Sequence, residues 1–299
     1  MVEYRSFEDP QINETFSCDR CEVSIIVPTY HRENSFPHVI ESIANQLANV
    51  LSDDISLLKS EIIIVVNWDE WEDSSAVKIA NKLIEDYRDQ IIKFQYPKEE
   101  WETSVYKKDE NMPFMGPIKV VRYSEKLGKM AAMQKWAELA KGKVVAFVDA
   151  DLKFPSDKRF LLQELIKPVL TEKVKLSIAS LGANKGNSWF FAKWLSWQRA
   201  LNRDEFIKFV KWLQKQWIGG YGIETALTLI VSKLFGKDQI KVIEWEWVWQ
   251  LTKVHKDPFA APISYVKMRY SVLKTRFKVG RLLNKNSKEI NELKDEIYS

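Results

Sequence analysis

The chain has 299 residues, of which 45% are hydrophobic and 29% charged, so it can form a packed core and is not globally disordered. Its net charge of only +4 argues against a general nucleic-acid binder, which would carry a strongly basic face. No run of about 18 apolar residues could span a membrane, and residues 1–20 lack the apolar centre of a signal peptide. Together with the low cysteine content, these features favour a cytoplasmic location.

The two cysteines, Cys18 and Cys21, are spaced C-x-x-C. A zinc site would need further Cys or His ligands, and the chain has no second pair at a suitable spacing. A local disulfide or chance spacing is the preferred interpretation, and a redox pair remains an alternative.

In the first half of the chain, predicted strands alternate with predicted helices. Runs of apolar, β-branched residues predict buried strands at residues 23–28, 61–66, 91–96, 118–122 and 143–148. Helical spacing of apolar residues predicts helices at residues 37–50, around 77–87 and 128–140, and residues 97–117 read as a loop. This alternation predicts a mostly parallel sheet with helices on both faces. Ligands then bind at the carboxyl ends of the strands, where Tyr30, Asn67 and Asp149 would lie.

The second half is richer in aromatic and basic residues. We expect a strand at 176–181, a helical, Trp-rich segment at 187–217, a glycine loop at 219–222, a helix at 223–235, a strand at 240–251 and basic helices from about residue 260. No internal repeat is visible.

The triplet Asp149-Ala150-Asp151 follows a buried strand directly. Residues i and i+2 of an extended backbone can point to the same side, so both carboxylates could reach one divalent cation. Mg²⁺ or Mn²⁺ prefers oxygen ligands and bridges phosphate oxygens. Taken alone, such a D-x-D motif could equally be a solvated turn.

The wider pattern resembles the GT-A glycosyltransferases of the broad family 2-like group. The resemblance is carried by Val23 to Glu33 (VSIIVPTYHRE), Glu61 to Asn67, Lys126 to Lys129 (KLGK) and Val148 to Asp151, in the order and spacing of that family. It implies an α/β, Rossmann-like nucleotide-diphospho-sugar transferase fold, with a mostly parallel sheet flanked by helices and a helical C-terminal extension.

The resemblance also implies roles in binding the donor. Pro28, Tyr30 and Glu33 would hold the nucleoside, with Glu33 on the ribose, and Asn67 or Asp69 would contact the base. Gly128 would allow close approach of the backbone, and Lys129 would meet phosphate or base. Asp149 and Ala150 would complete the donor site. A surface lysine at a helix start is the alternative for Lys129.

Later residues resemble the retaining branch that includes glucosyl-3-phosphoglycerate and mannosyl-3-phosphoglycerate synthases. Gly219 to Glu224 (GGYGIE) is followed, after a helix and a strand, by Gln250 to Lys256 (QLTKVHK). In that branch Gly220, Tyr221 and Gly222 would line the sugar and acceptor pocket. His255 would join Asp149 and Asp151 as a ligand of Mg²⁺ or Mn²⁺, although a surface histidine in a Lys-rich loop is the alternative.

Glu224 and Asp151 are the residues expected to act in catalysis. Glu224 would serve as general base in an inverting enzyme, or would orient the donor sugar or acceptor in a retaining one. A helix N-terminal glutamate with no catalytic role is the simpler interpretation.

The resemblance divides the chain into a lead-in (1–21), a nucleotide-sugar-binding half (22–155), an acceptor-binding half of the same domain (156–259) and a basic helical tail (260–299). The donor would be of the UDP-glucose or GDP-mannose type, and the acceptor a small anionic molecule, a sugar or a lipid phosphate. Aromatic and basic residues that could bind the acceptor, or simply pack in the core, are Trp189, Phe190, Phe191, Trp194, Trp197, Trp212, Trp217, Lys193, Arg199, Arg203 and Lys211.

The tail has seven basic residues and no acidic one between Lys267 and Lys285. Such a segment can contact an anionic membrane as a peripheral protein, form a homodimer interface or be a solvated face.

The leading hypothesis is therefore a metal-dependent, retaining hexosyltransferase. An inverting polyprenyl-phosphate glycosyltransferase of the family 2 type is the close alternative. A nucleotidyltransferase would share the sheet and the carboxylates, but no Gly-rich triphosphate loop follows the first strand. A non-catalytic nucleotide-sugar-binding homologue is the alternative outside enzymes.

Overall fold

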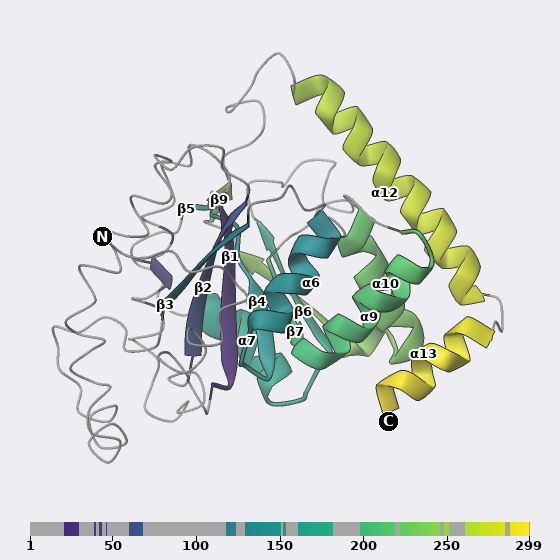
Figure 1. Cartoon of the computed structure of the whole chain (residues 1–299), viewed down its shortest axis with the longest axis horizontal. Coiled ribbons are helices and arrows are strands. Elements are labelled where there is room, and N and C mark those ends of the chain that lie inside the picture. The colour runs from purple at the N-terminus through teal and green to yellow at the C-terminus, as the bar shows by residue number, and fades with distance from the viewer. Residues whose placement is uncertain are drawn as a thin grey trace, which may run out of the picture.

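The chain forms a mixed α/β structure (Figure 1). The computed structural model describes residues 21–29, 39, 42–43, 46, 60–67, 118–123, 129–150, 152–153, 161–181, 198–218, 222–245, 248–250, 261–284 and 288–298. The predicted strand at 91–96, the predicted helix around 77–87 and the predicted loop at 97–117 lie outside these residues. Of the predicted helix at 37–50, the described positions 39, 42, 43 and 46 are helical.

Seven strands form the main sheet, in the order β3-β2-β1-β4-β7-β6-β8. They are β1 (Val23–Thr29), β2 (Ser60–Asn67), β3 (Ile118–Tyr123), β4 (Val144–Phe147), β6 (Leu176–Leu181), β7 (Arg199–Asn202) and β8 (Ile240–Trp245). The pairs β3–β2, β2–β1, β1–β4 and β6–β8 are parallel, and β7 runs antiparallel to both of its neighbours. The predicted mostly parallel sheet is confirmed, with β7 as the reversed strand.

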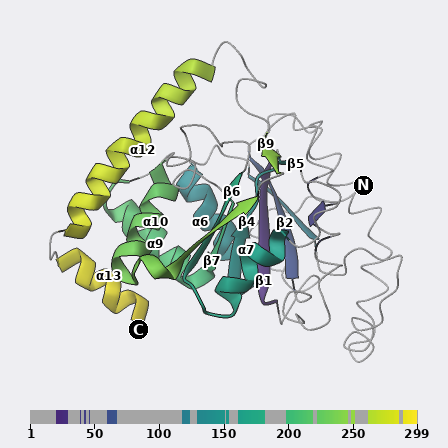
Figure 2. The ribbon, with the colours of Figure 1, turned by 180° about the vertical axis from the view of Figure 1, so that it is seen from behind.

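Alternating side chains of the strands supply two cores, one on each face of the sheet. On β1, Ile26 packs in one core and Ile25 and Val27 pack in the other. The first core is covered by α6 (Lys129–Leu139) through Met133 and Trp136. The second is covered by α7 (Leu161–Leu170), whose apolar face lies against the opposite side of the sheet (Figure 2). Because successive residues of a strand point to opposite faces, a run of apolar residues is required to cover both.

The C-terminal half adds four helices, α9 (Arg203–Lys215), α10 (Ile223–Leu234), α12 (Ala261–Asn284) and α13 (Lys288–Tyr298). A 3-10 turn, η3 (Lys237–Gln239), connects α10 to β8. Val279 and Leu283 of α12 and Leu293 of α13 belong to the same core as α6, so the two last helices pack on the domain. None of the helices in the described part of the chain is long and apolar enough to cross a membrane.

The predicted elements need three corrections in this half. The segment 187–217 is not helical throughout, because Arg199–Asn202 is strand β7 and is held between β4 and β6. The strand predicted at 240–251 is two strands, β8 and β9 (Trp249–Gln250), and β9 pairs with β5 (Leu152–Lys153) in a separate small sheet. Helix α7 was not predicted at all.

Cys21 is disulfide-bonded and buried. Since the chain has only two cysteines, this favours the local disulfide with Cys18 over the chance spacing.

The start of α10 packs tightly against α12 at Gly222. A Cβ added to Gly222 would lie 1.9 Å from Oγ1 and 2.5 Å from Cβ of Thr275, so one of the two helices would have to move. We expect Gly222→Ala to lower the free energy of unfolding by about 1–3 kcal/mol through overpacking.

Gly280 of α12 provides the matched control, because nothing lies within 4 Å of the position of its Cβ. In a helix interior Gly→Ala is favourable by about 1 kcal/mol, so Gly280→Ala should be neutral or stabilising. Urea unfolding followed by far-UV circular dichroism measures both changes. Equal stability of the two variants would contradict the close contact at Thr275.

Candidate active site

The candidate site lies at the carboxyl edge of the sheet, next to the point where the strand order reverses. β1 has β2 on one side and β4 on the other, and all three are parallel, so their carboxyl ends meet at one edge. In open α/β sheets this switch point is where ligands bind. Because β7 is antiparallel to β4, with Arg199 opposite Phe147, the amino end of β7 lies at this edge as well.

Asp149 follows β4 by two residues and is half-buried. Its Oδ2 accepts a hydrogen bond from Nε2 of Gln198 at 2.9 Å. Gln198 itself is buried, being 1% exposed, so the amide fixes the orientation of the carboxylate from within the protein. The local fold thus holds one carboxylate at the end of β4, whereas the neighbouring Ala150 is buried in the core.

Arg199, the next residue, connects the same edge to the start of α10. Its side chain is fully buried, and Nη1 donates to the backbone carbonyl of Glu224 at 2.9 Å. Burial lowers the pKa of Arg199 to about 10, and the negative charge of Glu224 acts in the opposite direction. Arg199 therefore still carries its charge at neutral pH, inside the protein and next to Glu224.

Glu224 is in the first turn of α10 and only 2% exposed. Its Oε1 forms an ion pair with Nζ of Lys129, the first residue of α6. Its Oε2 is buried and has no hydrogen-bond partner among the described residues. A buried carboxylate oxygen without a partner is costly, and it is the type of group that a ligand hydroxyl can satisfy.

A second, smaller contact brings two other predicted segments together. β5 begins one residue after Asp151, and β9 ends five residues before His255. The two strands pair in antiparallel fashion, with Leu152 opposite Gln250. The chain next to Asp151 and the chain leading to His255 are therefore neighbours. No group of three His, Cys, Asp or Glu side chains gathers within the described ranges, which contain neither Asp151 nor His255.

Of the predicted site residues, Lys129 and Glu224 contact each other, and Asp149 is linked to Glu224 through Gln198 and the adjacent Arg199. Pro28 is in β1 near its carboxyl end and Asn67 is the last residue of β2, both at the same edge. Gly222 caps the start of α10 and contacts α12. The predicted residues Tyr30, Glu33, Asp69, Gly128, Asp151, Gly220, Tyr221 and His255 lie outside the described residues.

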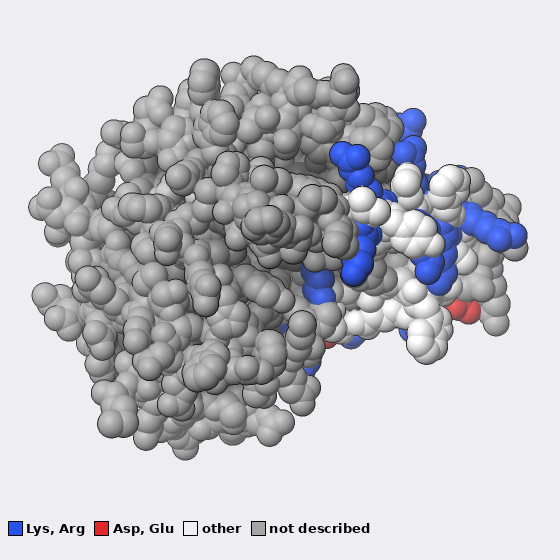
Figure 3. All heavy atoms as spheres, turned by 90° about the horizontal axis from the view of Figure 1, so that it is seen from above, with Lys and Arg blue, Asp and Glu red and all other residues white. Residues whose placement is uncertain are grey.

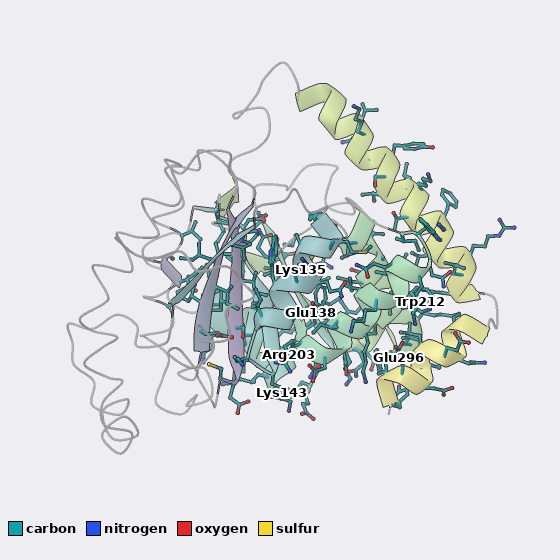
Figure 4. The ribbon with its side chains drawn as sticks, viewed as in Figure 1. Lys135, Glu138, Lys143, Arg203, Trp212 and Glu296 are labelled. Atoms are coloured by element: carbon teal, nitrogen blue, oxygen red, sulfur yellow. The ribbon has the colours of Figure 1, made fainter. Side chains whose placement is uncertain are left out.

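Of the aromatic and basic residues considered for the acceptor, those that the structure describes separate into different environments, and Trp189, Phe190, Phe191, Lys193, Trp194 and Trp197 lie outside the described residues. Trp212 is on the buried face of α9 and packs in the core within the helical layer (Figure 4). Arg203 lies near Lys143 at the opposite edge of the sheet, where its Nη1 donates to the carbonyl of Ala140 at 2.8 Å (Figure 4). Neither of these residues is at the candidate site, and Trp217 is exposed at the end of α9.

Gln198 contacts Asp149 and Arg199 contacts Glu224, so this pair of residues links the end of β4 to the start of α10. The sequence predicted this role for neither residue. In the sequence, Arg199 is only one of several basic residues that could meet an acceptor. The signal in the sequence is a polar pair directly before the short apolar run Ala200-Leu201. It becomes informative only when Arg199–Asn202 is recognised as a strand between β4 and β6.

Residues 104–222 match the family model "Glycosyl transferase family 2". The match covers less than half of the chain, begins after β2 and extends through β7 and α9 to Gly222. The matched span thus includes the predicted motifs Lys126 to Lys129 and Val148 to Asp151 and ends within the later motif Gly219 to Glu224. The partial match and the likeness of fold agree with the predicted resemblance to the GT-A, family 2-like glycosyltransferases.

The solved structures similar to this one include several of glucosyl-3-phosphoglycerate synthase from Mycobacterium tuberculosis. One complex with Mn²⁺, uridine-diphosphate-glucose and phosphoglyceric acid aligns with a TM-score of 0.54 and 16% identity, over 87% of this chain and 80% of that one. Another, with Mg²⁺ and uridine diphosphate, aligns with a TM-score of 0.53 and 16% identity, over 86% and 79%. At this identity the likeness concerns the fold. A search among curated proteins by sequence finds no match.

Proposed function

We propose that the protein transfers a hexose from a nucleoside-diphosphate sugar to an acceptor hydroxyl, with the help of Mg²⁺ or Mn²⁺ and with retention at the anomeric carbon. The observation that carries the proposal is the link made by β7. Its first residue and the one before it hold Glu224 and Asp149 at one edge of the sheet. Residues 22–155 would bind the donor and 156–259 the acceptor, in the cytoplasm.

The residues present fit a divalent cation. Asp149 offers a carboxylate at the end of β4, and the amide of Gln198 that orients it is neutral and leaves its negative charge in place. Asp151 and His255 would be the further ligands, and the pairing of β5 with β9 supports their proximity. Carboxylate and neutral imidazole suit Mn²⁺ and Mg²⁺. When bound, the ion would offset the negative charge that develops on the departing diphosphate.

Glu224 would orient a hydroxyl group of the donor sugar or the acceptor. Lys129 and Arg199 compensate its negative charge, and Oε2 can still accept a hydrogen bond. This arrangement suits the retaining interpretation, in which Glu224 positions a substrate. Lys129 has three donor protons, so its contact with Glu224 is compatible with the proposed contact to phosphate.

The donor proposed is of the UDP-glucose or GDP-mannose type. The similar structures carry uridine-diphosphate-glucose with phosphoglyceric acid, which supports a nucleotide sugar and a small anionic acceptor. An inverting transfer to a polyprenyl phosphate is the second candidate. It is favoured by one observation, the exposed apolar and basic surface of α12, which would bring the enzyme to its lipid acceptor.

The test is release of nucleoside diphosphate from UDP-glucose and GDP-mannose, with Mn²⁺ and with EDTA. We expect metal-stimulated release with one of these donors, and faster release with phosphoglyceric acid or a polyprenyl phosphate present. The anomeric coupling constant of the product, measured by NMR, separates retention from inversion. If Mn²⁺ stimulates no release from either donor or from other common nucleotide sugars, the protein is the non-catalytic homologue instead.

A further inference from the structure

The outer face of α12 carries an exposed apolar stripe. Tyr270, Leu273 and Phe277 are spaced by three and four residues, and Val266 continues the stripe by another four. At about 3.6 residues per turn, these positions fall on one side of the helix. All four side chains are exposed, Phe277 to 77%. The residues that α12 buries against the domain, Val272, Thr275, Val279 and Leu283, fall on the opposite side.

Basic side chains border this stripe on both sides. Lys267, Arg269, Lys274, Arg276, Lys278 and Arg281 are all exposed, and α12 contains no acidic residue. By helical spacing, Arg269 and Arg276 lie on one side of the stripe and the other four on the other side. Figure 3 shows the basic side chains around uncharged ones on this part of the surface. An exposed apolar stripe with a basic border is a candidate interaction surface.

Trp217 extends the patch from the end of α9. Its backbone has φ of 54°, a left-handed conformation that glycine normally supplies after a helix. The side chain is 89% exposed, so the conformation is not compensated by packing of the indole in the described protein. Its carbonyl accepts a hydrogen bond from Nζ of Lys278 at 3.4 Å, which places Trp217 beside α12.

We propose that the α12 face, defined as Val266, Tyr270, Leu273 and Phe277 with the six basic residues and Trp217, docks on the surface of an anionic lipid bilayer. Charge complementarity selects this occupant. Basic residues beside an apolar face bind anionic headgroups, while aromatic and aliphatic side chains enter the boundary between headgroups and acyl chains. Tryptophan and tyrosine are the residues that favour this interface. The inference does not depend on the proposed sugar transfer.

The experiment is flotation of the whole chain with vesicles, of phosphatidylcholine alone or of phosphatidylcholine mixed with phosphatidylglycerol. We expect binding to the mixed vesicles only, and weaker binding as salt is raised. The charge variant Lys267→Gln/Lys274→Gln/Lys278→Gln should bind about a hundredfold more weakly, because each basic residue near an anionic surface contributes about a fivefold change in affinity. The apolar variant Leu273→Ser/Phe277→Ser should lose binding at all salt concentrations.

A matched control removes the same charge elsewhere. Lys233, Lys237 and Lys241 are exposed on α10, η3 and β8 and do not belong to the α12 face. Their triple replacement by glutamine changes the net charge by the same amount and should leave vesicle binding as in the wild type. Trp217→Gly separates folding from docking. The melting temperature should rise because glycine suits the left-handed backbone at this position, and vesicle binding should fall because the exposed indole is removed.

Three results would overturn the proposal. One is the absence of binding to the mixed vesicles, and another is equal binding to both kinds of vesicle. The third is wild-type binding by the charge and apolar variants. If sedimentation shows a dimer that the apolar variant converts into a monomer while vesicles bind nothing, the face is an interface between two copies of the chain.

Discussion

Asp149→Asn is expected to slow metal-dependent sugar transfer by about a thousandfold, because charge stabilisation by a bound ion contributes several kcal/mol to such reactions. The amide preserves the shape of the side chain, and its oxygen can still accept the hydrogen bond from Gln198. The fold should therefore survive. What the variant loses is the negative charge that attracts the cation.

Thermal shift with Mn²⁺ alone checks this without any substrate. Wild-type protein should melt at a higher temperature as Mn²⁺ is added, since a ligand that binds the native state stabilises it. Asp149→Asn should show little of this shift, and Asp204→Asn, an exposed carboxylate on α9, should show all of it. A full Mn²⁺ shift in Asp149→Asn would remove Asp149 from the metal site. His255→Ala is tested by the rate of sugar transfer and by the thermal shift with Mn²⁺. Wild-type turnover in this variant would exclude His255 from the metal site.

Glu224→Gln should lower kcat by about a hundredfold, because a hydrogen bond to a charged acceptor in a buried site contributes about 1.5–3 kcal/mol. The amide is the same size and can still accept from Lys129, but the melting temperature should fall because buried Arg199 loses a compensating charge. If Glu224 orients a hydroxyl in the transition state, kcat falls more than KM rises. If it only binds the acceptor in the ground state, KM rises and kcat stays.

The control for this variant is Glu138→Gln on α6. Glu138 is exposed, and its Oε1 accepts a hydrogen bond from Nε2 of Gln134 at 2.8 Å, away from the sheet edge (Figure 4). The Glu138→Gln variant should retain full activity. Unchanged kcat and KM in Glu224→Gln would show that the buried glutamate is only a favourable first-turn residue of α10.

The strands of the first half could be predicted because local sequence decides them. β1, β2 and β4 are buried on both faces, which requires unbroken apolar runs that are visible in the sequence. The carboxyl edge of a parallel sheet then follows from topology. The sequence therefore predicts Asp149 and Lys129 at this edge, where Asp149 contacts Gln198 and Lys129 contacts Glu224.

β7 could not be found in this way. It has four residues and starts with a charged one, and its Trp-rich surroundings have helical spacing. Its conformation is imposed by pairing with β4 and β6, which are distant in sequence, and such tertiary pairing overrides local preference. The contacts of Gln198 with Asp149 and of Arg199 with Glu224 could not be predicted from the sequence for the same reason. Arg199 in particular would be expected at the surface, since arginine is rarely fully buried without a partner.

The reversed direction of β7 also limits which changes of chain length the enzyme can accommodate. Gln198 and Arg199 are neighbours in the chain, yet they hold two different groups, a carboxylate and the first turn of a helix. Deleting one residue between 198 and 202 would shift part of β7 by one position relative to β4 and β6. The shifted side chains would then point to the opposite face of the sheet. The amide of Gln198 would then take the place from which Arg199 reaches α10, and the arginine would move to the other face of the sheet. Length variation among relatives should therefore spare these five positions and accumulate before them.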